Sequence, residues 1–143
     1  MNQQFYTTVD DVKTPDHVWV FISDKSNVLG SESARIARSV YGRTMSNNEG
    51  FEQTGKGQSY GVVVREENRF TMVPFEELRS NMFTLYGRAM ADTGKKYVLP
   101  DFLANVLHRQ LEDVRYIVNE IFIRCSDKTK FIFPISWKKA FKL

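Results

Sequence analysis

The sequence is poor in the residues that build disulfides and metal sites. Its 143 residues include one cysteine, Cys125, and two histidines, His17 and His108. A lone cysteine forms no intrachain disulfide, and the two histidines stand on different predicted elements without carboxylates or cysteines at ligand spacing. We therefore expect neither a disulfide framework nor a metal site, and the sequence indicates no cofactor.

Long apolar runs are also missing. The runs that occur, such as Val18–Ile22 and Phe131–Phe133, are far shorter than the ~20 residues that a membrane span needs. The first residues show no basic segment followed by an apolar one, so no signal peptide is expected, and the cytoplasm is the expected location. With 42% hydrophobic and 13% aromatic residues, the chain can bury a core as a single domain over 1–143.

Charge is small overall and unevenly placed. The formal net charge is +3, but residues 1–24 carry four aspartates against Lys13 alone, while residues 124–143 are strongly basic. A basic end, including the tail over 138–143, can serve an anionic partner, or it can be a solvated surface that keeps the protein soluble.

Hydrophobic periodicity predicts alternating strands and helices. Residues 1–16 are predicted to be a loose segment and 43–58 a long exposed loop, because both are polar and rich in turn residues. Strands are predicted over 17–22, 59–65, 69–73, 95–99 and 131–133, and helices over 31–41, 74–89 and 101–121. This alternation predicts an α/β fold of three layers, α/β/α, with a mainly parallel or mixed sheet in which Val18–Ile22 pairs in parallel with Tyr60–Val64.

One helical stripe is unusually regular. It contains Leu103, Leu107, Leu111, Val114 and Val118 at spacings of three and four residues. Such a stripe fits a helix packed on the sheet, and it also fits a homodimer contact with a second copy of the chain.

Four short motifs resemble a family of small macro-domain-like proteins that is common in bacteriophage genomes. The first is a strand ending in Phe21-Ile22-Ser23-Asp24, followed by a loop and the helix over Gly30–Ala37. The others are Gly57-Gln58-Ser59-Tyr60 leading into a strand, the helix start Val73–Leu78, and the C-terminal Phe133-Pro134-Ile135-Ser136-Trp137. The resemblance implies a macro-like fold and two loops that hold the diphosphate and distal ribose of an ADP-ribose-like ligand.

Both of those loops depart from the family pattern. Ile22, Asn27 and Glu32 stand where the family has glycine, and Leu29 stands where it has histidine. A segment beginning Pro100-Asp101 replaces the later glycine-rich loop. Side chains at glycine positions prevent close backbone approach, and Glu32 repels phosphate, so the departures weaken the diphosphate site that the resemblance implies.

A ligand site is expected over the carboxyl end of the first long strand, with the 43–58 loop closing above it. Ligands of open α/β sheets bind at such strand ends, and the start of the following helix favours anions. Aromatic rings from the loop and the next strand would stack on a base. The candidate ligand-binding residues are Ser23, Asp24, Ser26, Asn27, Gly30, Ser31, Phe51, Lys56, Gly57, Ser59 and Tyr60. The alternative is an ordinary polar loop that caps the helix.

The sequence favours binding over catalysis, since no nucleophile, histidine and acid assemble into a catalytic set. Together with the resemblance, it indicates a phage-type accessory protein that binds a nucleotide-derived small molecule, ADP-ribose-like or a cyclic-nucleotide signal, and counters host defence in the host cytoplasm. The alternative is a protein-binding inhibitor of a host enzyme, and a third hypothesis is an ADP-ribose-processing hydrolase. Nucleic-acid binding is disfavoured, because a core strand followed by a solvated tail explains the aromatic and basic residues near the C-terminus.

Overall fold

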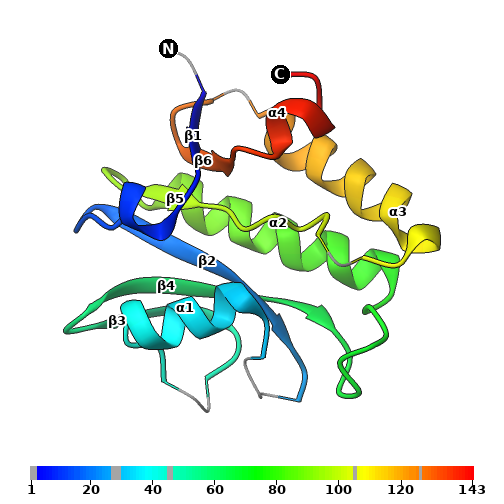
Figure 1. The fold of residues 1–143 in the computed structure, drawn as a ribbon, viewed down its shortest axis with the longest axis horizontal. Coiled ribbons are helices and arrows are strands. Elements are labelled where there is room, and N and C mark those ends of the chain that lie inside the picture. Colours follow the sequence, from blue (N-terminus) through cyan, green and yellow to red (C-terminus); the bar gives the residue numbers. More distant parts are fainter. Residues whose placement is uncertain (1–2, 27–29, 45–46, 105, 126) are drawn as a thin grey trace.

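The computed structural model describes residues 3–26, 30–44, 47–104, 106–125 and 127–143. Its centre is a six-stranded mixed sheet with the strand order β1-β6-β5-β2-β4-β3 (Figure 1). The strands are β1 (Gln4–Tyr6), β2 (His17–Asp24), β3 (Gly50–Thr54), β4 (Gly57–Arg65), β5 (Lys96–Val98) and β6 (Phe131–Pro134). All neighbours pair in parallel except β3 and β4, which form an antiparallel pair.

The two longest strands form the buried middle of the sheet. β2 and β4 pair in parallel with Val18 opposite Gln58 and Ile22 opposite Val62, which confirms the predicted pairing. Successive side chains of a strand point to opposite faces. Val18 and Val20 pack into one hydrophobic cluster, whereas Trp19 and Phe21 pack into another, so both faces of the sheet are covered.

The smaller cluster lies under α1 (Glu32–Val40), which crosses one face of the sheet (Figure 1). The sequence offers Ser31 or Ser33 as a cap for this helix, and Ser31 is its N-cap, with the side-chain oxygen accepting from the Ala34 N–H at 3.1 Å. Gly42 follows the helix with φ of +74°, which a glycine adopts without strain. Ala34 and Ala37 are fully buried, so the helix lies close to the sheet.

The larger cluster lies under α2 (Phe75–Ala91) and α3 (His108–Val118) on the other face. Apolar residues spaced three and four apart predict a helical stripe of Phe75, Leu78, Met82, Leu85 and Ala89. All of these except the half-buried Phe75 are buried in α2. A π-helical turn, η2 (Asn119–Ile123), continues α3. The fold is therefore α/β with helices on both faces of the sheet, as expected.

The N-terminal segment differs from its prediction. Instead of remaining loose, it contributes β1, which pairs in parallel with β6, and a 3₁₀ turn, η1 (Val9–Asp11). Phe5 packs edge-on against Phe133 at 6.1 Å, and this apolar contact explains why so polar a segment is held in place. The basic tail is also partly ordered, because α4 (Trp137–Ala140) places Trp137 in the core.

Two further expectations are corrected between the long strands. The 43–58 segment is not wholly a loop, because its second half forms β3 against β4. Residues 69–73 form no strand: a single bridge joins Arg65 and Met72. Asn68 explains the latter, since its side-chain oxygen accepts from the N–H groups of Phe70 and Thr71 at 2.9 Å and folds the chain into a tight turn.

The long helix predicted over 101–121 is wrong in its first third. α3 begins only at His108, after a turn in which Phe102 packs into the core, 2% exposed. Val114 and Val118 are buried within the same chain, while Leu107 is 49% exposed. The residues proposed for a homodimer contact therefore do not share one exposed helical stripe. In the part of the chain that the structure describes, no helix has the length and apolarity to cross a membrane.

Candidate functional site

The connections of the sheet create a switch point between β2 and β5. From β2 the chain passes through α1 on one face towards β4, whereas from β5 it passes through α3 on the other face to β6. Because the chain leaves these neighbouring strands in opposite directions, a crevice opens beyond their carboxyl ends, where open α/β sheets bind ligands.

A cavity of about 530 Å³ occupies this position. Its volume is within the range of small-molecule sites, about 300–1,000 Å³. It is lined by segments from β1 and η1, from β2 and the first turn of α1, and from the chain after β5 and β6. The lining residues are Tyr6, Thr7, Thr8, Val9, Trp19, Ile22, Ser31, Glu32, Ser33, Ile36, Pro100, Asp101, Ala104, Pro134, Ile135 and Ser136.

Two serines bind the first turn of α1 to the end of β2. The Ser31 hydroxyl donates to the Ile22 carbonyl at 2.6 Å, and the Ile22 N–H donates to the Ser33 hydroxyl at 2.9 Å. Because β5 pairs with β2 only up to Trp19, these serines satisfy backbone groups beyond the end of that pairing. The indole N–H of Trp19 also donates to the Ser33 carbonyl at 2.9 Å, so three hydrogen bonds join α1 to β2 in this wall of the cavity.

The N-terminal segment forms another wall. The Tyr6 hydroxyl donates to the Leu99 carbonyl at 2.7 Å, and its ring packs edge-on against Trp19 at 5.9 Å. Asp11 accepts from the N–H groups of Thr7 and Thr8 at 3.0 Å and fixes the two threonines that line the cavity. These backbone hydrogen bonds lower the pKa of Asp11 below its ordinary value, so the carboxylate stays ionised at neutral pH.

Asp101 forms the base of the cavity on the side of β5 and β6. One carboxylate oxygen accepts from the Trp137 indole at 3.1 Å, and the other accepts from the Ser136 hydroxyl at 2.8 Å. The first oxygen also accepts from the Leu103 N–H at 3.0 Å. All three donors are neutral, so the carboxylate is held in position while its negative charge remains uncompensated by them.

The cavity is acidic. Among the described residues that line it, Glu32 and Asp101 are the charged ones. Burial raises the pKa of Tyr6, and the negative charges of Asp101 and Glu32 add to that rise, so both carboxylates act on the phenol. In addition, no group of histidine, cysteine, aspartate and glutamate side chains in the described ranges is arranged to hold a metal ion.

Among the candidate residues from the sequence, Ser31 lines this cavity. Ser23 and Asp24 are 2% and 6% exposed at the end of β2, and Asp24 accepts hydrogen bonds from the N–H and hydroxyl of Ser26. Gly30 directly precedes the helix cap, and Asn27 lies outside the described residues.

The other candidate residues belong to the β3–β4 hairpin, which does not close over the end of β2. Its tip at Lys56 and Gly57 lies beside the start of β2, because Gln58 pairs with Val18 while Arg65 pairs with Asp24. Six residues of extended strand separate these positions, about 20 Å. The structure therefore does not assemble the strand-end residues and the hairpin tip into one site.

The aromatic and hydroxyl candidates on the hairpin have other partners. Ser59 and Tyr60 are 1% and 7% exposed, which places their side chains in the core. Phe51 lies next to two cations, with Arg88 at 4.3 Å and Lys95 at 5.1 Å from its ring centre. Ring surface that these cations cover is not free to stack on a base.

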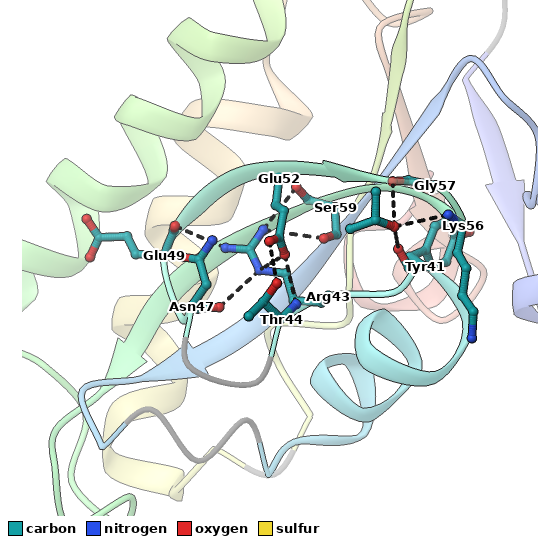
Figure 2. Close-up of polar contacts among 10 residues, drawn as sticks. Tyr41, Arg43, Thr44, Asn47, Glu49, Glu52, Lys56, Gly57 and Ser59 are labelled. Carbon is teal, nitrogen blue, oxygen red and sulfur yellow. Dashed lines mark hydrogen bonds and ion pairs between the residues drawn. The ribbon is translucent and has the colours of Figure 1, made fainter.

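Arg43 holds the chain before the hairpin against β4, and Figure 2 shows its guanidinium among acceptors from both sides. It donates to the carbonyls of Asn47, Glu49 and Ser59 at 3.0–3.2 Å. Burial lowers the pKa of the guanidinium, whereas the charge of Glu52, 3.5 Å away, raises it. The arginine stays charged at neutral pH in either case. This buried network has a structural role in positioning the loop.

Sequence reasoning missed most of the cavity. Tyr6, Thr7, Thr8 and Val9 fall in the segment predicted to be loose, and Asp101 was assigned to a helix. Two features of the sequence did point to the cavity. They are the polar start of α1, Ser31-Glu32-Ser33, and the Pro100-Asp101 segment that stands in place of a glycine-rich loop, and both line the cavity.

The aromatic residues near the C-terminus belong to the core. Phe131, Phe133 and Trp137 are at most 2% exposed, so their rings are not available to stack on nucleic-acid bases.

Comparison of the sequence with protein-family models and with curated proteins gave no match.

Proposed function

We propose that this protein is a binding domain that holds a small organic molecule in the cavity at the β2–β5 switch point. The position of the cavity carries the proposal, because sheets of this type place their ligands beyond the carboxyl ends of the strands that border the switch point. The rigid walls formed by Trp19, Tyr6 and the α1 serines support it, since preformed sites bind without the cost of ordering.

Binding without catalysis fits the chemistry of the lining. The Ser31 and Ser33 hydroxyls hold the Ile22 backbone, and Asp101 holds Trp137 and Ser136, so these groups are engaged in structural hydrogen bonds. A nucleophile or a general base needs a free position next to the reacting atom. Hydrolysis of an ADP-ribose-like substrate is therefore the less favoured proposal.

The ligand class we propose is a nucleotide-derived small molecule. The macro-like resemblance suggests this class, and apolar walls formed by Val9, Ile36, Pro134 and Ile135 suit a nucleoside. The phosphates would have to lie outside, because Glu32 and Asp101 repel them. Sequestering of a host defence signal by a phage-encoded protein in the host cytoplasm rests on the resemblance alone.

Native mass spectrometry of the purified full chain tests the proposal directly, because a retained ligand adds its mass to the 16.6 kDa protein.

A second experiment measures the shift in unfolding temperature caused by ADP-ribose, cyclic AMP and adenosine. Ala104→Phe, which places a ring at the cavity rim, should abolish any shift that the wild type shows. Phe51→Ala and Lys56→Ala on the hairpin should leave it unchanged. The reverse pattern would favour the strand-end site that the sequence predicts.

One observation favours the alternative, a protein-binding inhibitor of a host enzyme. Phe70 is 77% exposed at the tip of the turn that Asn68 fixes, and its neighbour Arg69 has a positive φ of 65°. Aromatic residues, phenylalanine included, are enriched in the cores of protein interfaces. A pull-down from host lysate with the wild type and Phe70→Ser, read by mass spectrometry, tests this: a host enzyme lost with Phe70→Ser supports it.

Self-association through the part of the proposed stripe that is not fully buried, the exposed Leu107 and the half-buried Leu103 and Leu111, stays a prediction. Light scattering at the monomer mass across micromolar concentrations would exclude it.

A further inference from the structure

The lining of the cavity combines an aromatic corner with two carboxylates. The rings of Tyr6 and Trp19 meet at 67° with their centres 5.9 Å apart, and both residues line the cavity. Trp19 is 3% exposed and stacks on Tyr41, so the half-buried Tyr6 presents the more accessible ring. Glu32 and Asp101 stand on the same lining, from the first turn of α1 and from the chain after β5. This is the composition of sites that bind organic cations, in which ring faces and nearby anions attract an alkylated ammonium or a charged heteroaromatic ring.

No side-chain cation on the described lining offsets these two negative charges, although the positive start of α1 partly offsets that of Glu32. It contains no lysine, arginine or histidine, and none of the nine positions that the structure leaves undescribed has a charged side chain in the sequence. The donors to Asp101 are an indole, a hydroxyl and a backbone N–H, which leave its charge in place. Asp11, held by Thr7 and Thr8, adds a third carboxylate close behind the wall.

The cations that neighbour the lining segments in sequence have other partners or do not line the cavity. Lys138 on α4 lies over the Phe5 ring at 4.9 Å, and Lys25 pairs with Glu66 and Glu77 at 3.2 Å and 3.0 Å. Arg35 is exposed on α1 and is not among the residues that line the cavity.

We propose that the cavity selects an organic cation, and that a nucleotide-derived ligand enters it through a positively charged base or an alkylated ammonium group rather than through phosphate. The inference rests on the proposed binding function and specifies the charge of the ligand. Attraction to a partly desolvated carboxylate and to the Tyr6 ring gives the cation its advantage over a neutral molecule of the same shape.

Two pairs of probes of matched shape isolate the charge. Choline is compared with 3,3-dimethylbutan-1-ol, its uncharged isostere, and 1-methyladenosine, which is cationic at pH 7, with its neutral isomer N6-methyladenosine. Binding to the full chain is measured by chemical-shift changes in NMR titrations at 50 mM and 300 mM salt. We expect each cation to bind about fivefold or more tighter than its neutral partner, with a smaller ratio at high salt.

Variants then assign the effect to the cavity. Glu32→Gln should weaken binding of the cationic probes about threefold and leave binding of the neutral probes unchanged, because the exposed carboxylate contributes charge rather than shape. Glu112→Gln, an equally exposed change on α3, is the matched control and should alter neither. Ala104→Phe should remove binding of all probes, with circular dichroism confirming that the variant is folded.

The outcomes separate this inference from the proposed function. If neutral and cationic probes bind equally and Ala104→Phe removes both, the cation preference is overturned while the binding function stands. If phosphorylated nucleotides bind more tightly than their nucleosides, the cation preference is likewise overturned. If neither the probes nor the nucleotide panel binds at millimolar concentration, both proposals fail.

Discussion

The Arg43 guanidinium lies 5.0 Å from the centre of the Phe21 ring, with the arginine only 2% exposed. Phe21 is on the central strand, so this contact ties the segment before the β3–β4 hairpin to the middle of the sheet. Arg43 also serves as the donor to three backbone carbonyls. One side chain therefore replaces the secondary structure that this stretch of backbone lacks.

Replacing Arg43 should be among the most damaging single changes. Arg43→Met fills much of the same volume but leaves the carbonyls of Asn47, Glu49 and Ser59 without their donor, and we expect a loss of about 3–5 kcal/mol in the free energy of unfolding. Urea denaturation measures it. Arg35→Met on the exposed side of α1 is the control, expected within about 0.5 kcal/mol of the wild type. Equal stability of the two variants would contradict this account.

Glu52 should make stability depend on pH. Burial alone would raise the pKa of its carboxyl, but hydrogen bonds from the Thr44 hydroxyl and N–H and the charge of Arg43 outweigh burial and lower it. The folded protein thus binds this proton less readily than the unfolded chain. The stabilisation is complete above the unfolded pKa of about 4.3 and is lost as pH falls through the lowered folded pKa.

Urea midpoints between pH 7 and pH 3 test this for the wild type and Glu52→Gln. We expect the wild type to be more stable at pH 7. The difference should shrink as pH falls below about 4.3 and should vanish below the lowered folded pKa, where Glu52 is protonated and both side chains are uncharged. Glu112→Gln should follow the wild type throughout. A gap between Glu52→Gln and wild type that is independent of pH would exclude the charge as its cause.

Two glycines should respond oppositely to alanine. A Cβ at Gly61 would lie 2.6 Å from the Asn48 carbonyl oxygen and 2.7 Å from the Phe21 ring, so Gly61→Ala should cost about 1–3 kcal/mol. Gly87 lies within α2 with nothing near its Cβ position, and Gly87→Ala should stabilise the protein by about 0.5–1 kcal/mol. Thermal unfolding measures both, and a stabilised Gly61→Ala would show that this close approach is absent.

Burial, rather than the regular spacing of the stripe, should decide which of its residues matter. Val118 is fully buried and Leu107 is 49% exposed, although the sequence places both on one stripe. Val118→Ala should lower the free energy of unfolding by about 1–3 kcal/mol, while Leu107→Ala should change it by less than about 0.5 kcal/mol. Chemical denaturation compares them. If Leu107→Ala proved the more harmful, the helix would have to extend back to it.

Much of the architecture follows from local patterns in the sequence. The doubly buried strands β2 and β4, the Ser31 cap, the glycine after α1 and the stripe of α2 were all predictable. Each depends on a periodicity or a backbone preference that acts over a few residues, so neighbouring residues suffice to specify it.

The cavity and its charge were decided by the tertiary structure. Polar residues 4–11 become a wall only because β1 pairs with β6, more than 120 residues later in the chain. The predicted long helix is interrupted because Asp101 binds Trp137 and Ser136 and Phe102 enters the core. These contacts join segments that are distant in the chain, so a local periodicity in the sequence cannot predict them. The sequence by itself determined the layers and the central β2–β4 pairing, while long-range packing determined which strands border the switch point and which side chains meet there.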